Sequence, residues 1–233
     1  MSIFQYAPEI IERFPNTVGG VIIGQNVRNA AHLETLQQAF QDEQDKVKTR
    51  LGDTPLSEIA TLAAWRGVFR GFGTDPTKYR SAPEALLRRL TKKDDLPSIN
   101  ALVDIGNLIS IRYALPVCVI DRDQIAGGIT VHFADGTEAY TELHSDEIIY
   151  PEVGEVIFTD ARKEVFARRW CWRQSMQSTA QVGTTQVVVT IEAQHEHGHR
   201  DINAAVEEMI ALFQTHCGGT YDYAILDAGR LTV

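Results

Sequence analysis

Residues 99–120, INALVDIGNLISIRYALPVCVI, place an apolar helix directly before a short strand. The stretch from Ile99 to Tyr113 is apolar around most of its circumference, which is typical of a buried helix. Pro116 then forbids further helix, because proline lacks the amide hydrogen that an interior turn donates. The residues from Val117 to Ile120 have the apolar, β-branched composition of a strand. The stretch predicts a central buried helix that leads into a sheet.

Helical patterns dominate before this stretch and strand patterns dominate after it. We expect helices at 32–51, 55–69, 82–90 and 202–216, the last of them capped by Asp201. Strands are expected at 18–27, 117–120, 129–133, 137–141, 155–159, 164–166, 186–191 and 223–226. This order predicts an α+β fold with mostly antiparallel strands. We expect residues 1–233 to form a single domain, with a helical part at about 30–95 and a core at about 96–233.

The composition is that of a globular protein of 233 residues, with 44% apolar and 23% charged residues. The N-terminal residues show no basic segment followed by an apolar run, so we expect no signal peptide and a cytoplasmic location. No apolar run is long enough for a membrane helix, and we expect no membrane partner. The three cysteines are odd in number and far apart, which favours a reducing compartment: Cys118, Cys171 and Cys217.

Charge is distributed unevenly along the chain. The net charge of −9 opposes nucleic-acid binding by the whole surface, and we expect no DNA partner. From Arg66 to Lys93, however, there are eight basic and only two acidic residues. A second basic cluster lies beside the only WxW motif: Arg162, Lys163, Arg168, Arg169 and Arg173. Each cluster is either a solvated face or part of a local phosphate-binding surface.

Three polar residues form a stripe on the otherwise apolar central helix. Asn100, Asp104 and Asn107 recur at i, i+4 and i+7, so they lie on one helix face. A stripe of this kind either caps and fixes the helix through a buried polar network or faces a ligand pocket. The pocket hypothesis places an adenosine, a ribose or an amino-acid group against it.

The segment from Arg169 to Thr179 combines tryptophans, arginines and hydroxyl groups. Trp172 and Arg173 suit stacking on a base, and Gln174, Ser178 and Thr179 offer hydrogen bonds to a carbonyl or phosphate group. The alternative is that Trp170 and Trp172, two apart on a strand, pack on one face of a sheet.

The sequence EAQHEHGHRD offers a third possibility, since His195, His197 and His199 alternate. Alternating histidines can hold a metal if they lie on a strand, which would give a metal-dependent hydrolase. The neighbouring Gly198 and Asp201 favour a loop before a helix instead. The sequence contains no Walker A loop, GxGxxG, GxSxG or CxxC motif, which argues against the common nucleotide hydrolases, dehydrogenases and α/β-hydrolases.

Two segments carry a resemblance to a known family. The first contains Val103-Asp104-Ile105-Gly106-Asn107, then the turn from Leu115 to Asp121, then Asp123 and Ile125. The second runs from Val156 to Asp160, through Ala167 to Ser178, to Thr184-Thr185. Together they resemble the editing domain of the phenylalanyl-tRNA synthetase β subunit, here as a free-standing copy. The segment from Tyr79 to Arg89 also resembles versions of this domain that occur as separate proteins.

The resemblance implies an α+β fold with a β-sandwich-like layer, tRNA binding, and hydrolysis of wrongly charged aminoacyl-tRNA. It implies no metal or redox cofactor. Cys118 stands where the family turn has histidine, and Thr179 stands where the family has glutamate after serine. These departures favour the alternative of a non-catalytic module that binds tRNA or an amino acid.

The leading hypothesis is therefore a deacylase that acts in trans on mischarged aminoacyl-tRNA. Its expected catalytic residues are Asn100, Asp104, Gln174 and Thr179. Its expected substrate-binding residues are Asn107, Cys118, Trp172, Arg173 and Ser178. Its expected tRNA contacts are Arg66, Arg70, Arg80, Arg88 and Arg89. No pattern predicts the amino acid, the tRNA identity or an oligomeric state.

Overall fold

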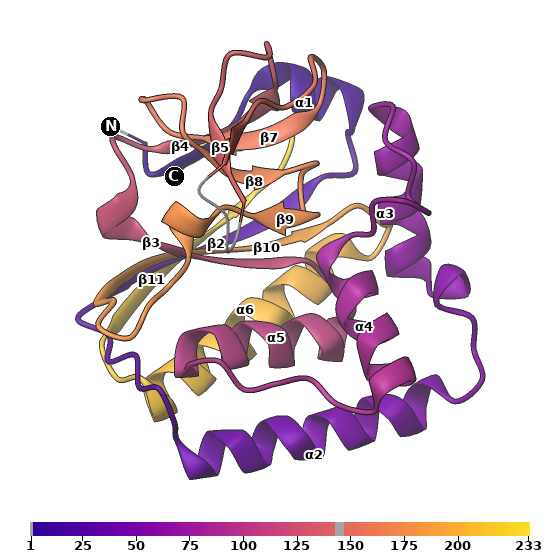
Figure 1. Ribbon diagram of the computed structural model, residues 1–233, viewed down its shortest axis with the longest axis vertical. Helices are drawn as coiled ribbons and strands as arrows, with labels where there is room; N and C mark the ends of the chain where they lie inside the picture. The colour runs from indigo at the N-terminus through magenta and orange to yellow at the C-terminus, as the bar shows by residue number, and fades with distance from the viewer. Residues whose placement is uncertain (1, 143–146) are drawn as a thin grey trace.

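The computed structural model describes residues 2–142 and 147–233, and it stacks two sheets on a layer of helices (Figure 1). The middle layer is a four-stranded antiparallel sheet with the order β11-β2-β10-β3. Its strands are β2 (Val18–Gln25), β3 (Val117–Asp121), β10 (Gln186–Ala193) and β11 (Thr220–Leu226). The second sheet has the order β1-β4-β7-β8-β9.

The five strands of the second sheet come from distant parts of the chain. They are β1 (Phe4–Tyr6), β4 (Ile129–Phe133), β7 (Val156–Thr159), β8 (Val165–Arg168) and β9 (Arg173–Gln174). All neighbours are antiparallel except β1 and β4, which pair in parallel. A short pair, β5 (Tyr140–Thr141) and β6 (Ile148–Ile149), lies beside this sheet.

Side-chain alternation divides the middle sheet into two apolar faces. Val187, Val189 and Ile191 of β10 belong to the core beneath the helices, whereas Val188 belongs to the core between the two sheets. Because strand side chains alternate with a period of two, Thr190 and Glu192 follow Val188 onto the face between the sheets. The two sheets thus form the sandwich that the family resemblance implied.

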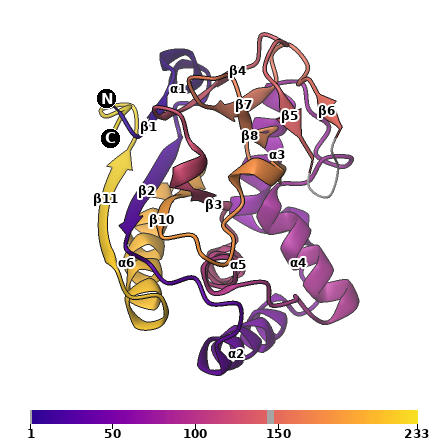
Figure 2. The same ribbon diagram turned by 60° about the vertical axis from the view of Figure 1, so that its left-hand side comes forward.

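Two long helices cover the other face of the middle sheet (Figure 2). These are α5 (Ala101–Tyr113) and α6 (Gly198–His216), which also pack on each other. α2 (Glu34–Leu51) lies outside α5, and α4 (Ala82–Lys93) crosses one end of it. The remaining helices are α1 (Pro8–Arg13), α3 (Ala60–Gly71) and the short 3-10 turns η1 (Leu56–Glu58), η2 (Arg122–Gln124) and η3 (Met176–Ser178).

The predicted α+β class, with its central buried helix and layered sandwich, is confirmed, although several element boundaries were wrong. The helix expected from Pro55 begins only at Ala60, because Pro55 starts a 3-10 turn. The last helix begins at Gly198, so Asp201 lies inside its first turn and is not its cap. β1, α1, β6 and β9 were not predicted, and each spans six residues or fewer.

Among the described residues, no helix has both the length and the apolar composition that a bilayer crossing requires.

The close packing of α6 on the middle sheet depends on Gly20. A Cβ atom at Gly20 would lie 2.5 Å from Val206 Cγ2 and 2.9 Å from Ile202 Cγ2. Both methyl groups belong to buried side chains of α6. The helix and sheet therefore approach as closely as they do because β2 has no side chain at this point.

We predict that Gly20→Ala lowers the free energy of unfolding by about 1–3 kcal/mol, because the added methyl group overpacks a filled core. Chemical denaturation monitored by circular dichroism measures the change. The matched control is Gly67→Ala in α3, where an added Cβ meets no atom within 4 Å. Gly67→Ala should leave the free energy of unfolding unchanged or raise it. An equal decrease for both substitutions would contradict the close packing of α6 at Gly20.

Candidate functional site

A buried ion pair shapes the segment that links β8 to β9. Glu155, just before β7, accepts two hydrogen bonds from the Arg168 guanidinium, of 2.8 and 2.7 Å. It also accepts one of 3.0 Å from the amide of Arg169. Both charged side chains are less than a tenth exposed. The buried Arg169 guanidinium lies 3.5 Å from the same carboxylate, so Glu155 joins two consecutive arginines and fixes the start of the turn.

The turn from Arg168 to Trp172 is tight and strained. Arg169 and Trp170 both have positive φ, at 45° and 62°, a conformation that non-glycine residues rarely adopt. Two backbone hydrogen bonds hold the turn in place: the Trp170 amide donates to the Val156 carbonyl (2.7 Å), and the Trp172 amide donates to the Arg168 carbonyl (3.0 Å). Backbone strain of this kind gathers at functional sites.

The turn directs its two tryptophans into different environments. Trp170 is fully buried between the sheets and makes edge contacts with Trp65 and Phe14. Trp172 is half-buried, packs edge-on against Tyr79, and lies under the guanidinium groups of Arg169 and Arg173, each 4.7 Å from its ring centre. The alternative that both tryptophans pack on one sheet face is therefore wrong, because they lie in a turn and not on a strand.

A small cavity of about 110 Å³ lies behind this turn. Its walls come from both sheets and from the start of α4, and most of them are apolar. The lining residues are Ala82, Pro116, Val117, Cys118, Phe158, Ala167, Trp170, Cys171, Trp172, Arg173, Gln174 and Glu192. A hydrogen bond of 2.7 Å from the Ala82 amide to the Cys171 carbonyl joins α4 to this wall.

Glu192 is the acidic residue of the cavity wall, and it is almost fully buried. Its Oε1 accepts hydrogen bonds from the Tyr6 hydroxyl (2.6 Å) and from the Trp170 indole (2.9 Å). Burial raises the pKa of the Glu192 carboxyl to about 7, although these two bonds act in the opposite direction. At neutral pH the group can therefore both take up and release a proton.

Cys118 and Cys171 also line the cavity, but neither is suited to act as a nucleophile. Burial, and then the nearby Glu192 carboxylate, raise the pKa of both thiols well above the usual range. A thiol attacks only as the thiolate, so both groups stay inert near neutral pH.

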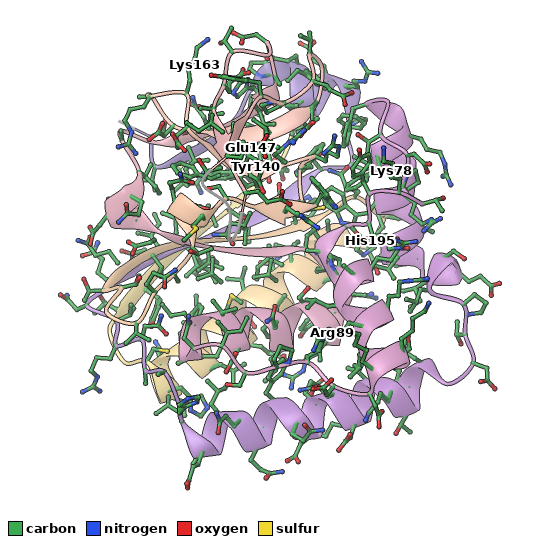
Figure 3. All side chains as sticks on the ribbon, in the orientation of Figure 1. Lys78, Arg89, Tyr140, Glu147, Lys163 and His195 are labelled. Atoms are coloured by element: carbon green, nitrogen blue, oxygen red, sulfur yellow. The ribbon has the colours of Figure 1, made fainter. Side chains whose placement is uncertain are left out.

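A basic groove adjoins the cavity, and the two share Trp172 and Arg173. The groove follows one face of α4, whose residues 85, 88, 89, 92 and 93 have the spacing of a single helical stripe. Its lining residues are Lys78, Tyr79, Arg80, Ala85, Arg88, Arg89, Lys92, Lys93, Trp172 and Arg173. Figure 3 labels two of these residues, Lys78 and Arg89.

Most cations of the groove remain available for a ligand. Arg89 lies 3.8 Å from Asp95, and Arg80 lies 3.8 Å from Glu84. Arg173 pairs with Glu142. Within the described ranges, no ion pair joins an acid to the other four cations: Lys78, Arg88, Lys92 and Lys93.

Of the predicted substrate and catalytic residues, the structure gathers Cys118, Trp172, Arg173 and Gln174 around the cavity. The Gln174 amide donates to the carbonyls of Val119 (2.8 Å) and Ser178 (2.9 Å), which ties β9 to β3. Ser178 is fully buried and bonds to backbone carbonyls, and Thr179 bonds to Met176, so neither lines the cavity.

The polar stripe on α5 does not face this cavity, contrary to the pocket hypothesis. Asn100 is the N-cap, accepts from the Val103 amide (3.1 Å) and donates to the Ala180 carbonyl (3.0 Å). Asp104 is buried and accepts from the Ser98 hydroxyl (2.5 Å) and the Ile99 amide (2.7 Å), while burial raises its pKa. Asn107 is half-buried on the same helix. The first backbone amides of a helix have no partner within the helix and need acceptors from side chains, which explains why Asn100 and Asp104 lie at the start of α5.

The predicted tRNA-contact residues divide into two groups. Arg80, Arg88 and Arg89 line the groove. Arg66 instead forms a 2.6 Å ion pair with the buried Glu84 and faces a separate depression, and Arg70 is exposed outside the groove lining. The acidic partner on the next helix explains why Arg66 was misplaced.

The histidine run does not form a strand. His195 bonds Asp201 (2.8 Å), and His199 lies 3.4 Å from Asp227. His197 precedes the first turn of α6. Within residues 2–142 and 147–233, no group of three acidic, histidine or cysteine side chains is placed to hold a metal ion.

The expected site residues did not include Glu192, Cys171, Lys78, Tyr79, Lys92 and Lys93, although the three lysines belong to the basic cluster from Arg66 to Lys93. A glutamate at the end of the apolar strand QVVVTIEA was a usable signal, because burying an ionisable group costs free energy unless the group is paired or hydrogen-bonded. The spacing of Arg88 with Lys92 and of Arg89 with Lys93 was another, because residues four apart share a helix face.

A family model described as the B3/4 domain matches residues 64–218, about two thirds of the chain. The chain belongs to the B3/4 domain family. It is therefore a phenylalanyl-tRNA synthetase β-like domain, as its residues suggested. The matched segment contains the groove helix, the strained turn and Glu192, whereas Tyr6 lies outside it.

Two related proteins support the assignment to a phenylalanyl-tRNA synthetase β-like domain. The phenylalanine–tRNA ligase β subunit of Rickettsia conorii is 39% identical over 70 residues, which cover 30% of this chain and 8% of that protein. The β subunit of Shewanella oneidensis is 28% identical over 83 residues, covering 36% and 10% respectively. The B3/4 chain thus spans a small fraction of the length of these relatives.

A solved structure also covers most of the chain. It is an N-terminal fragment of the phenylalanyl-tRNA synthetase β subunit from Pyrococcus horikoshii, with a TM-score of 0.48 and 10% sequence identity. The alignment covers 94% of this chain and 50% of the fragment.

We predict that Asn100→Ala lowers the free energy of unfolding by about 2 kcal/mol, because it removes a helix cap and a buried hydrogen bond. The matched control is Asn107→Ala on the same helix, which should change stability by less than about 0.5 kcal/mol. Thermal and chemical unfolding measure both. Equal stability of the two variants would contradict a capping role for Asn100.

Proposed function

We propose that this B3/4 domain binds the aminoacylated end of tRNA and hydrolyses its ester bond when the amino acid is wrong. One observation carries the proposal: a groove lined by cations opens beside a small, mostly apolar cavity that contains a buried carboxyl group. A charged tRNA end has the matching parts, namely phosphates, bases and an esterified amino acid. The relationship to phenylalanine–tRNA ligase β subunits supports this substrate class.

The groove supplies the phosphate contacts of the proposal. Lys78, Arg88, Lys92 and Lys93 lie on one face and offer positive charge to a backbone that carries one negative charge per nucleotide. Their local concentration offsets the acidic net charge of the chain.

Trp172 and Arg173 form the boundary between groove and cavity, where the terminal nucleoside would lie. The half-buried Trp172 ring offers a stacking surface of the kind that single-stranded nucleic acids use. Arg173 lies over this ring and lines both depressions, so its guanidinium can approach either a phosphate or a developing oxyanion.

The cavity then receives the aminoacyl group. An ester of this kind is already activated, so hydrolysis requires mainly a held substrate and an oriented water molecule. Cys118 forms one wall as a neutral, apolar thiol, where the resembled family has a histidine. This replacement supports a substrate amino acid different from that of the resembled family.

The direct test is deacylation of a panel of radiolabelled, correctly and incorrectly charged tRNAs with and without the protein. We predict faster release of the amino acid from at least one mischarged species. Release of the same amino acid from its cognate tRNA at the same rate would contradict an editing role.

We predict that Arg88→Ala and Lys92→Ala together weaken tRNA binding about tenfold or more and reduce the slope of log affinity against log salt by about one unit per lost contact. Filter binding across a salt series measures both quantities. The control is Lys163→Ala, compared per charge removed, since this exposed lysine lies in the turn between β7 and β8, away from Arg89 (Figure 3). An equal loss in the control would show that only net charge matters.

A non-catalytic binding module is the second candidate function. The inert Cys118 thiol and the engagement of Thr179 with the Met176 carbonyl favour it. Salt-dependent tRNA binding without release from any charged species would support this candidate against the hydrolase.

A further inference from the structure

The two oxygens of the Glu192 carboxylate have different environments. Oε1 accepts both of the hydrogen bonds, from Tyr6 and from Trp170. Oε2 accepts none from the residues that the structure describes, and Glu192 is part of the cavity wall. The carboxylate is therefore anchored through one oxygen, and the other is left without a hydrogen bond at a residue of the cavity wall.

The surroundings of Glu192 make a purely structural role an incomplete explanation. A neutral acceptor on β10 would satisfy Tyr6 and Trp170 equally well, without the free energy needed to bury an ionisable group. Gly19 lies opposite Glu192 on β2, and a Cβ there would collide with the Tyr6 hydroxyl. The middle sheet thus leaves the space that Tyr6 needs to reach and orient the carboxylate.

The cavity has room for a water molecule, which is the second reactant in hydrolysis. Its volume of about 110 Å³ exceeds what one water molecule occupies in the liquid, roughly 30 Å³. The cavity shares Trp172 and Arg173 with the basic groove, so a group held at the end of the groove would lie next to it.

We infer that Glu192 is the general base of the site: its Oε2 takes a proton from a cavity water that attacks the aminoacyl ester. This inference rests on the proposed function and names the group that performs it. It departs from the sequence-based set, in which Asn100, Asp104, Gln174 and Thr179 were the expected catalytic residues.

The step is balanced in atoms and charge. As Oε2 removes the proton, the water oxygen forms a bond to the ester carbonyl carbon, giving a tetrahedral oxyanion. When the bond between this carbon and the ribose oxygen breaks, Glu192 returns the proton to that oxygen. The products are the free amino acid and tRNA with its terminal hydroxyl restored, and no other co-reactant is needed.

The groups that face Glu192 set its proton affinity. They are Tyr6 from β1, Cys118 from β3, and Trp170 and Cys171 from the strained turn. Tyr6 and Trp170 stabilise the carboxylate by donating hydrogen bonds, and the two thiols are neutral. Because burial raises the pKa of Glu192 to about 7, the basic form accumulates above that pH. The deacylation rate should therefore rise with pH and level off above about pH 8.

The first variant is Glu192→Gln, which keeps an acceptor for Tyr6 and Trp170 but cannot take up a proton. Single-turnover deacylation of the mischarged species should slow by about 100-fold or more, with tRNA affinity unchanged. The matched control is Gln186→Glu or Gln186→Ala on the same strand, which lies outside the cavity lining and should keep the wild-type rate.

The second variant is Tyr6→Phe, which removes one hydrogen bond to Oε1 and leaves Glu192 in place. Since this bond lowers the pKa of Glu192, its loss should move the midpoint of the pH–rate profile upward. The rate at high pH should stay close to that of the wild type. A purely structural role for Glu192 does not predict such a shift.

The outcomes separate the two proposals. If the wild type releases no amino acid, the hydrolase function and the role of Glu192 both fail. If the wild type releases it and Glu192→Gln does so equally fast, Glu192 is not the base and the function stands. If Glu192→Gln does not fold, Tyr6→Phe decides: an upward shift supports the inference, and an unchanged profile overturns it.

Discussion

The arrangement of the site depends on the buried ion pair between Glu155 and Arg168. Two hydrogen bonds join the side chains, and a third joins Glu155 to the Arg169 amide. Together they stabilise consecutive left-handed residues, which the chain would otherwise avoid. Since the turn sends Trp170 inward and Trp172 outward, one contact defines both the inner wall of the cavity and the edge of the groove.

The sandwich determines the chemistry that is possible behind that turn. Even-numbered residues of β10 point into the layer between the sheets, so Glu192 lies in an apolar environment. Burial there raises its pKa into the range where a carboxyl group exchanges protons at neutral pH. Tyr6 comes from the N-terminal strand, outside the segment that the B3/4 family model matches. The N-terminal residues thus contribute directly to the environment of the proposed base.

Much of the fold was predictable because local rules decide it. Pro116 ends the central helix, and strand alternation and turn residues locate most strands. The site was predictable only in part. Trp172, Arg173 and Gln174 were found through an unusual local composition. Asn100 and Asp104 were misplaced because polar residues that bind backbone amides at a helix start can share one helix face, as pocket residues do.

Glu192 escaped sequence analysis for a different reason. Its significance comes from Tyr6, 186 positions earlier, and from a turn whose left-handed residues are not glycines. A glutamate in an apolar strand signals a buried charge, but neither long-range contacts nor strained backbone leave a local pattern that reveals its partners. For the groove, helical spacing indicates the basic stripe of α4, but the contribution of Trp172 arises only through tertiary packing.

The proposed function requires that groove and cavity form one binding site. The most direct measurement follows the three tryptophan indole N–H signals by NMR during titration with amide-linked aminoacyl-adenosine analogues, which cannot be hydrolysed. Trp172 lies between the groove and the cavity, and the Trp170 indole donates a hydrogen bond to Glu192 in the cavity wall. The signals of both should therefore shift with the same dissociation constant. The signal of Trp65, which does not line the cavity, should shift least. A shift of Trp172 alone, with Trp170 unchanged at saturation by every analogue, would contradict a single binding site, because the aminoacyl group would then never reach the cavity.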